Sequence, residues 1–271
     1  NNPPAAIEKN AIVRRGAGRM KTRITAIANQ KGGVGKTTTA AALAAGLHRK
    51  GYKVLTIDAD TQGNISYIMG ADTKQPGLYE ALKGTAIAGE AIQATAQGDI
   101  MASSPQLSGA DLEFKAKGWE YLLQETIKPV INNYHYIIID TPPQLGVLTI
   151  NALTAATDVI ITLGADIFSL QGIAQLYDTI NTIKRRSNPE LKTDGILITR
   201  YNARTILSRD LKDSIQGAAD HIGARLFKTV IREGIAIKEA QTLQEDIYTS
   251  APRSNPAIDY TAFISEYLKA K

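Results

Sequence analysis

The sequence has no cysteine and only three histidines among its 271 residues. The absence of cysteine excludes a disulfide scaffold, a thiolate zinc site, an iron–sulfur cluster ligated by this chain, and a cysteine nucleophile. Three histidines make a histidine-rich metal site a poor hypothesis. We therefore expect no thiol or iron–sulfur chemistry from this chain.

The sequence also lacks long hydrophobic runs. No stretch approaches the roughly 18 consecutive apolar residues of a membrane-spanning helix, and the polar residues 1–9 lack the apolar segment of a secretory signal. Hydrophobic residues make up 44% and charged residues 21% of the chain, which is typical of a soluble globular protein. We expect a folded cytoplasmic protein, and its length corresponds to one large α/β domain or two small ones.

The chain has little net positive charge outside residues 1–19. The net charge is +5, from 31 Lys+Arg against 26 Asp+Glu. Residues 1–19 hold four basic residues and one acidic residue and so contribute +3, which leaves +2 for the rest of the chain. An anionic partner is permitted, but it would have to contact a local basic patch.

Residues 1–19 are rich in Pro, Gly and Asn and show no apolar period, so we predict a flexible basic extension outside the folded domain. It is either an arm that contacts nucleic acid or sequence foreign to the working protein, such as vector-encoded residues or an upstream reading frame ahead of a start at Met20. We favour the second interpretation, because short basic runs are common without function.

From residue 22 onward, short runs rich in Ile and Val alternate with longer helical patterns. The predicted strands, each too short for a helix, are residues 24–28, 54–57, 136–139, 159–163 and 196–199. The predicted helices are residues 38–50, capped by Gly51, then 120–132, 171–186, 210–222 and a terminal helix at 256–271 packed on the core. This alternation predicts an α/β fold, with a mostly parallel twisted sheet and helices on both faces. Residues 64–118 are the least regular, and we expect helices and loops there.

A glycine-rich segment, NQKGGVGKTTT at residues 29–39, follows the first predicted strand and opens the first predicted helix. A phosphate-binding loop requires that context. Its glycines let backbone N–H groups converge on phosphate oxygens, and the helix adds the positive end of its dipole. Lys36 is expected to contact the terminal phosphates, and the Thr37 hydroxyl to ligate Mg²⁺. The predicted ATP-binding residues of the loop are Lys31, Gly32, Gly33, Val34, Gly35, Lys36, Thr37 and Thr38.

Three aspartates follow predicted strands. Asp140 ends the run 136–139, and Asp58 and Asp60 follow the run 54–57. Asp140 is expected to face the phosphate loop as a Walker B aspartate that holds Mg²⁺, because ligands bind at the carboxyl ends of parallel strands. One aspartate alone could be a turn residue, but the agreement of three favours a metal site.

A departure from the general pattern G-x-x-x-x-G-K-[ST] points to a family. Its first glycine would fall at position 30, where Gln30 stands beside a second lysine, Lys31. The loop thus resembles the deviant Walker A group, x-K-G-G-x-G-K-[ST], and the chain is most similar to the ParA/Soj partition ATPases. The resemblance covers nearly all of residues 20–271, and it is also carried by LTIDADTQGN, YHYIIIDTPPQLGVLTINAL, GILITRYNARTILS, IAIKEAQ and APRSNPAIDY.

The resemblance implies a single P-loop ATPase domain at residues 20–271 that hydrolyses ATP with Mg²⁺, slowly and with stimulation by a partner. Lys31 would reach across a two-fold interface to the partner's nucleotide, so that two chains sandwich ATP. Asp60 would orient the attacking water and Asp58 would support the metal shell. Such positioning suits phosphoryl transfer, which depends on in-line placement and neutralised charge. The implied catalytic residues are Lys31, Lys36, Asp60 and Asp140, and the implied metal residues are Thr37, Asp58 and Asp140.

The resemblance places adenine near residues 199–202, with Asn202 as a predicted contact, and near residues 229–235. There Ile231-Arg-Glu-Gly234 stands where the family commonly has Ile-Pro-Arg-Asn, so contacts do not transfer directly. Other departures are Thr61 for proline, Thr141 for cysteine and Gln144 for serine. They concern the tuning of hydrolysis and base selection, and leave the ATPase class intact.

Family members bind DNA without sequence preference as ATP-bound dimers, and a centromere-bound, ParB-like adaptor stimulates hydrolysis and releases them. The resemblance thus implies a nucleoid-associated homodimer that segregates a plasmid, chromosome or mobile element. Lys and Arg contacts to DNA phosphates, doubled by a dimer, would supply the binding. The alternative is that these side chains are merely solvated or complement helix dipoles. The candidates are Lys184, Arg185, Arg186, Arg209, Lys212, Arg225, Lys228 and Arg253.

The main alternative function is a MinD-like ATPase that cycles on a membrane or another surface. MinD-type proteins use a C-terminal amphipathic helix with a basic polar face. Here Asp259 and Glu266 lie in the last predicted helix, which argues against membrane binding. A scaffold that binds ATP without hydrolysing it is disfavoured by Asp60 and Lys31, and a nucleotide kinase or small-molecule ligase would lack Lys31.

Overall fold

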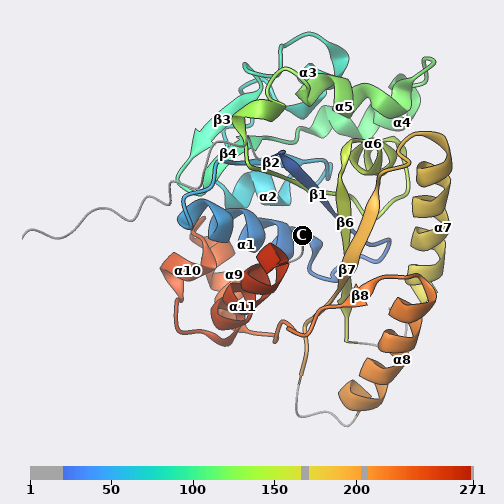
Figure 1. The fold of residues 1–271 in the computed structure, drawn as a ribbon. Coiled ribbons are helices and arrows are strands. Elements are labelled where there is room, and N and C mark those ends of the chain that lie inside the picture. The colour runs from blue at the N-terminus through green and yellow to red at the C-terminus, as the bar shows by residue number, and fades with distance from the viewer. Residues whose placement is uncertain (1–20, 166–170, 203–206, 270–271) are drawn as a thin grey trace, which may run out of the picture.

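The computed structural model describes residues 21–165, 171–202 and 207–269, apart from the side chains of residues 171 and 207–212. The predicted extension at residues 1–19 lies outside the described residues. The described chain forms an eight-stranded sheet with the order β3-β4-β2-β5-β1-β6-β7-β8 (Figure 1).

Every neighbouring pair of strands is parallel except β3 and β4. The strands are β1 (Arg23–Ala28), β2 (Val54–Asp58), β3 (Ile92–Thr95), β4 (Gly98–Met101), β5 (Tyr136–Asp140), β6 (Asp158–Gly164), β7 (Lys192–Thr199) and β8 (Arg225–Leu226). The five predicted strands are therefore confirmed as β1, β2, β5, β6 and β7, and the mostly parallel α/β fold is confirmed with them.

Helices cover both faces of the sheet. Those packed on one face are α1 (Lys36–Arg49), α2 (Asn64–Ile68), α9 (Ile235–Thr242), α10 (Ile247–Ser250) and α11 (Asn255–Lys269). Those packed on the other are α3 (Leu78–Lys83), α4 (Ala110–Glu113), α5 (Leu122–Ile127), α6 (Val147–Ala155), α7 (Gln171–Arg186) and α8 (Leu207–His221). In Figure 1, α1 and α9–α11 lie together on one side, and α7 and α8 lie on the opposite side. The 3₁₀ helices are η1 (Pro105–Gly109), η2 (Trp119–Tyr121) and η3 (Ile131–Asn133).

The central strands are apolar throughout because both of their faces are covered. Successive side chains of a strand point to opposite faces. In β5, Ile137 and Ile139 join the core cluster beneath α3 and α5–α8, whereas Ile138 joins the cluster beneath α1 and α11. All five residues of β5 are buried, as the continuous apolar run predicts.

The terminal helix packs on the core as predicted. α11 contacts α1 and buries Tyr260, Phe263 and Tyr267. None of the helices in the described part of the chain combines the length and the hydrophobicity that a bilayer crossing needs.

The prediction of one helix at residues 120–132 is wrong. The structure divides this segment into η2, α5 and η3, and α5 ends at Ile127. Pro129 has no backbone N–H and disfavours the helical conformation at the residue before it, so a continuous helix cannot pass this point.

The expectation of only helices and loops in residues 64–118 is also wrong. This segment contains β3 and β4, an antiparallel pair at the edge of the sheet. No residue of β3 is fully buried, so its sequence lacks the apolar run of a central strand, and pairing with β4 defines it instead. The two-residue strand β8 was too short to be predicted.

Candidate functional site

The loop between β1 and α1 is anchored by Asn29. Its side chain is buried, with Nδ2 donating to the Thr162 carbonyl at 2.6 Å and Oδ1 accepting from the Lys31 N–H at 2.9 Å. The amide thereby ties the beginning of the loop to β6. This contact sets where the chain leaves the sheet and turns toward α1.

Two glycines give the loop its shape. Gly33 and Gly35 have φ of 73° and 75°, a left-handed conformation that other residues adopt only with strain. Gly35 is the N-cap residue of α1, and neither a capping side chain nor an acidic residue satisfies the first turn in the described structure. The free N–H groups of that turn form an anion-binding site, since they also carry the positive end of the helix dipole.

Lys36 is buried at the beginning of α1. Its Nζ donates to the Lys31 carbonyl at 3.2 Å. Burial lowers the pKa of the ammonium, while the carboxylates of Asp140 and Asp60 act to raise it. The positive charge of Lys36 therefore lies near both Asp140 and Asp60, next to the phosphate loop.

Asp140 is the last residue of β5 and is completely buried. Neither of its carboxylate oxygens has a hydrogen-bond partner among the described residues. Burial and the nearby Asp58 raise its pKa well above the ordinary value, and the nearby Thr37 hydroxyl and Lys36 lower it only in part. A buried carboxylate next to a hydroxyl offers the oxygen ligands that Mg²⁺ prefers. The residues present therefore fit a magnesium ion held by Asp140 and Thr37.

Asp58 is completely buried too, but its oxygens are occupied. Oδ2 accepts from the N–H and the hydroxyl of Ser66 at 2.9 and 2.6 Å, and Oδ1 accepts from the Asp60 N–H at 3.1 Å. Burial raises the pKa of Asp58 to about 6. This bonding suits a supporting position behind the metal ligands more than direct ligation.

Asp60 lies on the wall of a cavity at the carboxyl edge of the sheet. The cavity has a volume of about 560 Å³ and opens over the phosphate loop. Small-molecule sites range from about 300 to 1,000 Å³. The predicted residues that the structure brings to this cavity are Gly32, Gly33, Gly35, Lys36, Thr37, Thr38 and Asp60.

The other predicted site residues do not line the cavity. Lys31 is half-buried, and its backbone N–H and carbonyl take part in the loop contacts described above. Val34 is buried, with its carbonyl accepting from the Thr199 hydroxyl at 2.9 Å. Asn202 is exposed just after β7, next to residues 203–206, which lie outside the described part of the chain. The roles predicted for these residues remain predictions.

Several cavity residues were not predicted. Gln62 and Asn64 follow Asp60, and Arg200, Arg232 and Glu233 lie within segments that the family resemblance had marked only as ranges. Two others, Gln241 of α9 and Tyr260 of α11, end the stretches IAIKEAQ and APRSNPAIDY that carry the family resemblance, but no role was predicted for them. Tertiary packing alone brings these two helices to the site.

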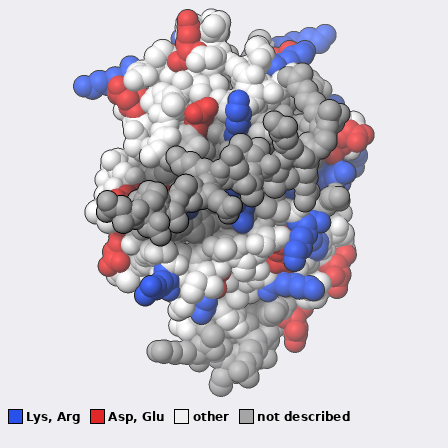
Figure 2. Space-filling model, turned by 60° about the vertical axis from the view of Figure 1, so that its left-hand side comes forward, with Lys and Arg blue, Asp and Glu red and all other residues white. Residues whose placement is uncertain are grey.

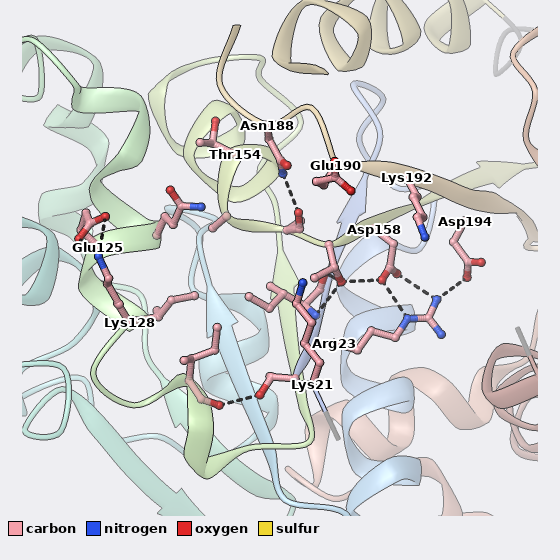
Figure 3. Close-up of a pocket in the computed structure, with 18 residues that line it drawn as sticks. Lys21, Arg23, Glu125, Lys128, Thr154, Asp158, Asn188, Glu190, Lys192 and Asp194 are labelled. Atoms are coloured by element: carbon pink, nitrogen blue, oxygen red, sulfur yellow. Dashed lines mark hydrogen bonds and ion pairs between the residues drawn. The ribbon is translucent and has the colours of Figure 1, made fainter. Parts of the chain in front are cut away.

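A larger cavity of about 910 Å³ lies at the amino-terminal ends of the strands, opposite the phosphate loop (Figure 3). It is lined by Arg23, Asp158 and Lys192, the first residues of β1, β6 and β7. Figure 3 shows Arg23 bridging Asp158 and Asp194, and Lys128 paired with Glu125, so these charged groups neutralise one another. Ligands of open α/β sheets bind at the carboxyl ends of the strands, so we place the candidate active site at the smaller cavity.

The basic candidates for DNA contact are dispersed. Lys184, Arg185 and Arg186 form the last turn of α7, and Arg253 and Lys228 are exposed elsewhere. Arg225 is engaged in an ion pair with Asp194 at 3.0 Å and lies over the Phe227 ring. The side chains of Arg209 and Lys212 lie outside the described residues. On the face shown in Figure 2, basic and acidic side chains are interspersed.

The stabilisation that Mg²⁺ gives should increase with pH. A carboxyl whose pKa is raised on folding, as for Asp58 from 3.8 to about 6, binds its proton more tightly when folded. Without metal, the stability contributed by this group is present at low pH and is lost as the pH rises through about 6. The pKa of the neighbouring ligand Asp140 is raised as well, in part by Asp58, and Mg²⁺ competes with the proton because the ionised carboxylate is the ligand. Thermal unfolding with ADP should therefore show a larger increase in melting temperature from MgCl₂ at pH 8 than at pH 5.5.

The control for this measurement is ADP with a chelator in place of MgCl₂, which should show no such increase at either pH. An equal increase from MgCl₂ at both pH values would contradict the assignment of the buried acids to the metal site.

The site combines a strand, a glycine-rich loop and an uncapped helix N-terminus with buried acids at the carboxyl ends of parallel strands. This combination defines a P-loop nucleotide hydrolase. Comparison with known proteins agrees with this class. A protein-family model described as an AAA domain matches residues 22–193. The chromosome-partitioning ATPase Soj of Thermus thermophilus is 36% identical over 250 residues, which cover 92% of this chain and 97% of that protein.

Solved structures are also similar. A Mycobacterium smegmatis structure described as cobyrinic acid a,c-diamide synthase with bound ADP and magnesium has a TM-score of 0.76 and 34% identity, covering 92% of this chain and 94% of that chain. A putative plasmid partition protein of Borrelia burgdorferi bound to AMPPNP has a TM-score of 0.78 and 27% identity, covering 92% and 99% of the two chains. The present chain belongs to the ParA/Soj family of P-loop ATPases. The predicted family, ATPase class and cofactors, ATP and Mg²⁺, are confirmed.

Proposed function

We propose that this ATPase forms a homodimer around Mg-ATP, binds double-stranded DNA without sequence preference in that state, and separates when ATP is hydrolysed. With a ParB-like adaptor, such a cycle would segregate a plasmid, chromosome or mobile element. The observation that carries the hydrolytic part is that Lys36 and Asp60 line one cavity, while the buried Asp140 lies close enough to Lys36 to act on its pKa, in a chain 36% identical to a chromosome-partitioning ATPase.

In the proposed reaction each residue acts on a different part of the nucleotide. The N–H groups of the first turn of α1 bind phosphate oxygens, and Lys36 balances their charge. Asp140 and Thr37 would hold Mg²⁺, which neutralises charge on the phosphates. Asp60 orients water in line with the scissile bond, and Asp58, held by Ser66 and the Asp60 N–H, keeps the backbone of Asp60 in place.

The outer side of the phosphate loop supports an approach by a second chain. Gly32 and Gly33 are exposed, and a Cβ built on Gly32 would have no described atom within 4 Å. This open surface adjoins Lys31, the lysine that the family resemblance assigns to the partner's nucleotide. A cation supplied across an interface makes dimerisation and the γ-phosphate depend on each other.

DNA binding would depend on basic residues that the dimer presents twice. The cluster at the end of α7, residues 184–186, consists of three consecutive basic residues in the last turn of the helix. Two copies of a weak patch on one dimer raise the affinity through effective concentration. The nucleotide would then control DNA binding through dimerisation.

The packing of α11 supports this function over the membrane-cycling alternative. The apolar face of α11 is covered by the core, with Phe263, Ile264 and Tyr267 at 0 to 1% exposure, and so is not presented to a lipid surface. Asp259 faces Arg232 and Glu266 accepts from the Thr229 N–H, so both acids of this helix serve internal contacts. A membrane-binding amphipathic helix would instead expose its apolar face and carry basic residues beside it.

A small-molecule ligase is a second candidate because of the synthase described for the M. smegmatis structure. A smaller cavity of about 270 Å³ adjoins Asp60 and is lined by Gln62, Ser108, Asp111 and Gln144, which would be the place for an acceptor. Lys31 favours the partition function, since a ligase has no need of a lysine directed at a second subunit.

The test is retention of arbitrary duplex DNA by the chain with ATP, ADP or no nucleotide. We expect retention with ATP only, and an affinity that falls steeply as salt rises. Residues 20–271 alone should behave like the full chain, because the switch is the nucleotide and not the basic extension. Sedimentation of the ATP-loaded dimer with anionic liposomes, without DNA retention, would support the membrane-cycling alternative instead.

Two variants sharpen this test. Lys31→Ala should lose both ATP-dependent dimerisation, followed by light scattering, and DNA retention. Asp60→Ala should bind ATP, remain dimeric on DNA and hydrolyse poorly. Unchanged dimerisation and hydrolysis in Lys31→Ala, or rapid turnover in Asp60→Ala, would contradict the assigned roles.

A further inference from the structure

Arg200 has an unusual backbone conformation beside the phosphate loop. It follows β7 directly and has φ of 51°, in the left-handed region that costs a non-glycine residue about 1 kcal/mol or more. Contacts on both sides hold it there. The Thr199 hydroxyl donates to the Val34 carbonyl at 2.9 Å, and the Tyr201 N–H donates to the Ile231 carbonyl at 2.9 Å. Strain that neighbouring contacts maintain is typical of functional sites.

The Arg200 side chain joins two walls of the candidate ATP cavity. NH1 donates to the Gly33 carbonyl of the phosphate loop at 3.2 Å, and NH2 donates to Oε1 of Glu233 at 3.2 Å. Both charged side chains line the cavity, with exposures of 60 and 58%. An ion pair so exposed contributes about 0 to 1 kcal/mol to folding stability, so stability alone does not account for it.

A second ion pair fixes the segment that carries Glu233. Nε and NH2 of Arg232 bind the carboxylate of Asp259 in α11, the shortest contact being 2.6 Å, and the Arg232 N–H donates to Asp259 Oδ2 at 2.9 Å. The Arg232 side chain therefore extends toward α11, while the Glu233 side chain extends toward Arg200 beside the phosphate loop.

We propose that Arg200 is a positioning residue for the nucleotide phosphates that acts through Gly33, and that Glu233 in turn positions Arg200. The C=O and N–H of one trans peptide point in opposite directions. Anchoring the Gly33 carbonyl therefore fixes the direction of the Val34 N–H and limits rotation in the loop just before α1. A preorganised loop loses less conformational entropy when it binds a nucleoside diphosphate or triphosphate.

The proposal concerns nucleotide affinity rather than the chemical step. The loop contacts the phosphates in the bound and the transition state alike, and such uniform binding changes KM while leaving kcat unchanged. It rests on the candidate site assigned above, but it does not depend on DNA or on the adaptor.

The experiment measures Mg-ADP affinity by calorimetry, KM and kcat for ATP, and melting temperature, in Arg200→Met. We expect Kd and KM to increase about fivefold, the effect of one lost hydrogen bond, with kcat within about twofold and the melting temperature nearly unchanged. Arg200→Lys should behave like Arg200→Met, since one ammonium cannot replace the two-pronged guanidinium. Glu233→Gln should weaken binding less, and it should have no further effect in the Arg200→Met background.

The matched control is Lys83→Met, which removes an exposed ion pair to Glu113 at 3.0 Å far from the cavity and should leave Kd and KM unchanged. Wild-type Kd and KM in Arg200→Met, or additive effects of the two substitutions, would overturn the proposal. Affinity is measured without DNA, so a fivefold effect here together with no ATP-dependent DNA retention would count against the partition function alone.

Discussion

Replacing Lys36 with alanine is expected to lower the rate of ATP hydrolysis by at least about 100-fold, the effect of removing one preorganised group that stabilises transition-state charge. Lys36 is the buried cation closest to the site, and both Asp140 and Asp60 act on its pKa. Without it, two carboxylates and the phosphates would face one another with Mg²⁺ as the remaining counter-charge. Steady-state phosphate release at saturating Mg-ATP measures the effect.

Lys50→Ala is the matched control for Lys36→Ala. Lys50 is exposed at the other end of α1, so its loss changes the charge of the chain equally without touching the cavity. Its turnover should equal that of the wild type. If Lys36→Ala hydrolysed ATP within tenfold of the wild type while binding Mg-ATP normally, the catalytic centre would have to lie elsewhere.

The largest expected loss of stability comes from Arg23→Met. Arg23 begins β1 and is partly buried, with Nε 2.9 Å from Asp158, NH2 2.9 Å from Asp194, and its guanidinium 3.8 Å from the centre of the Tyr267 ring. Removing one partner of a nearly buried ion pair leaves uncompensated charge, at a cost of about 3 kcal/mol. For a chain of this size we expect a decrease in melting temperature of roughly 6 to 12 °C.

Thermal unfolding of Arg23→Met should be compared with that of Lys128→Met. Lys128 pairs with Glu125 at 3.1 Å, but both side chains are more than half exposed, so its loss should cost less than about 1 kcal/mol. Adding Asp158→Asn to Arg23→Met should restore part of the stability, because Asp158 is the carboxylate that loses its cation, whereas Asp194 keeps its ion pair with Arg225. Equal melting temperatures for the two single variants would show that the Arg23 cluster contributes no more than a surface ion pair.

The central strands of the sheet could be predicted from the local pattern of apolar residues. The runs that became β1, β2, β5, β6 and β7 are apolar at every position because helices cover both faces of the sheet. The hairpin β3–β4 escaped prediction because an edge strand is half exposed and depends on its neighbour. The break in the segment 120–132 could have been read from Pro129, whose effect on a helix is local.

The phosphate loop and its acids were predictable for the same reason. Loop, cation and hydroxyl lie within a few consecutive residues, and each aspartate lies at or just after the end of a strand whose carboxyl end faces the loop in a parallel sheet. Residue type and spacing therefore predicted that Lys36, Thr37 and Asp140 lie near one another without knowledge of packing, and the chemical roles assigned to them remain predictions. The family comparisons agree with that pattern.

The other walls of the site were decided by tertiary structure. Gln241 and Tyr260 reach the cavity because α9 and α11 pack against α1, and Arg200 meets Gly33 across 167 residues of sequence. The same packing left Asp140 without donors and occupied Asp58 with Ser66. A sequence states which groups are present at one position, whereas burial, pairing and pKa arise from groups that only the folded chain brings within bonding distance.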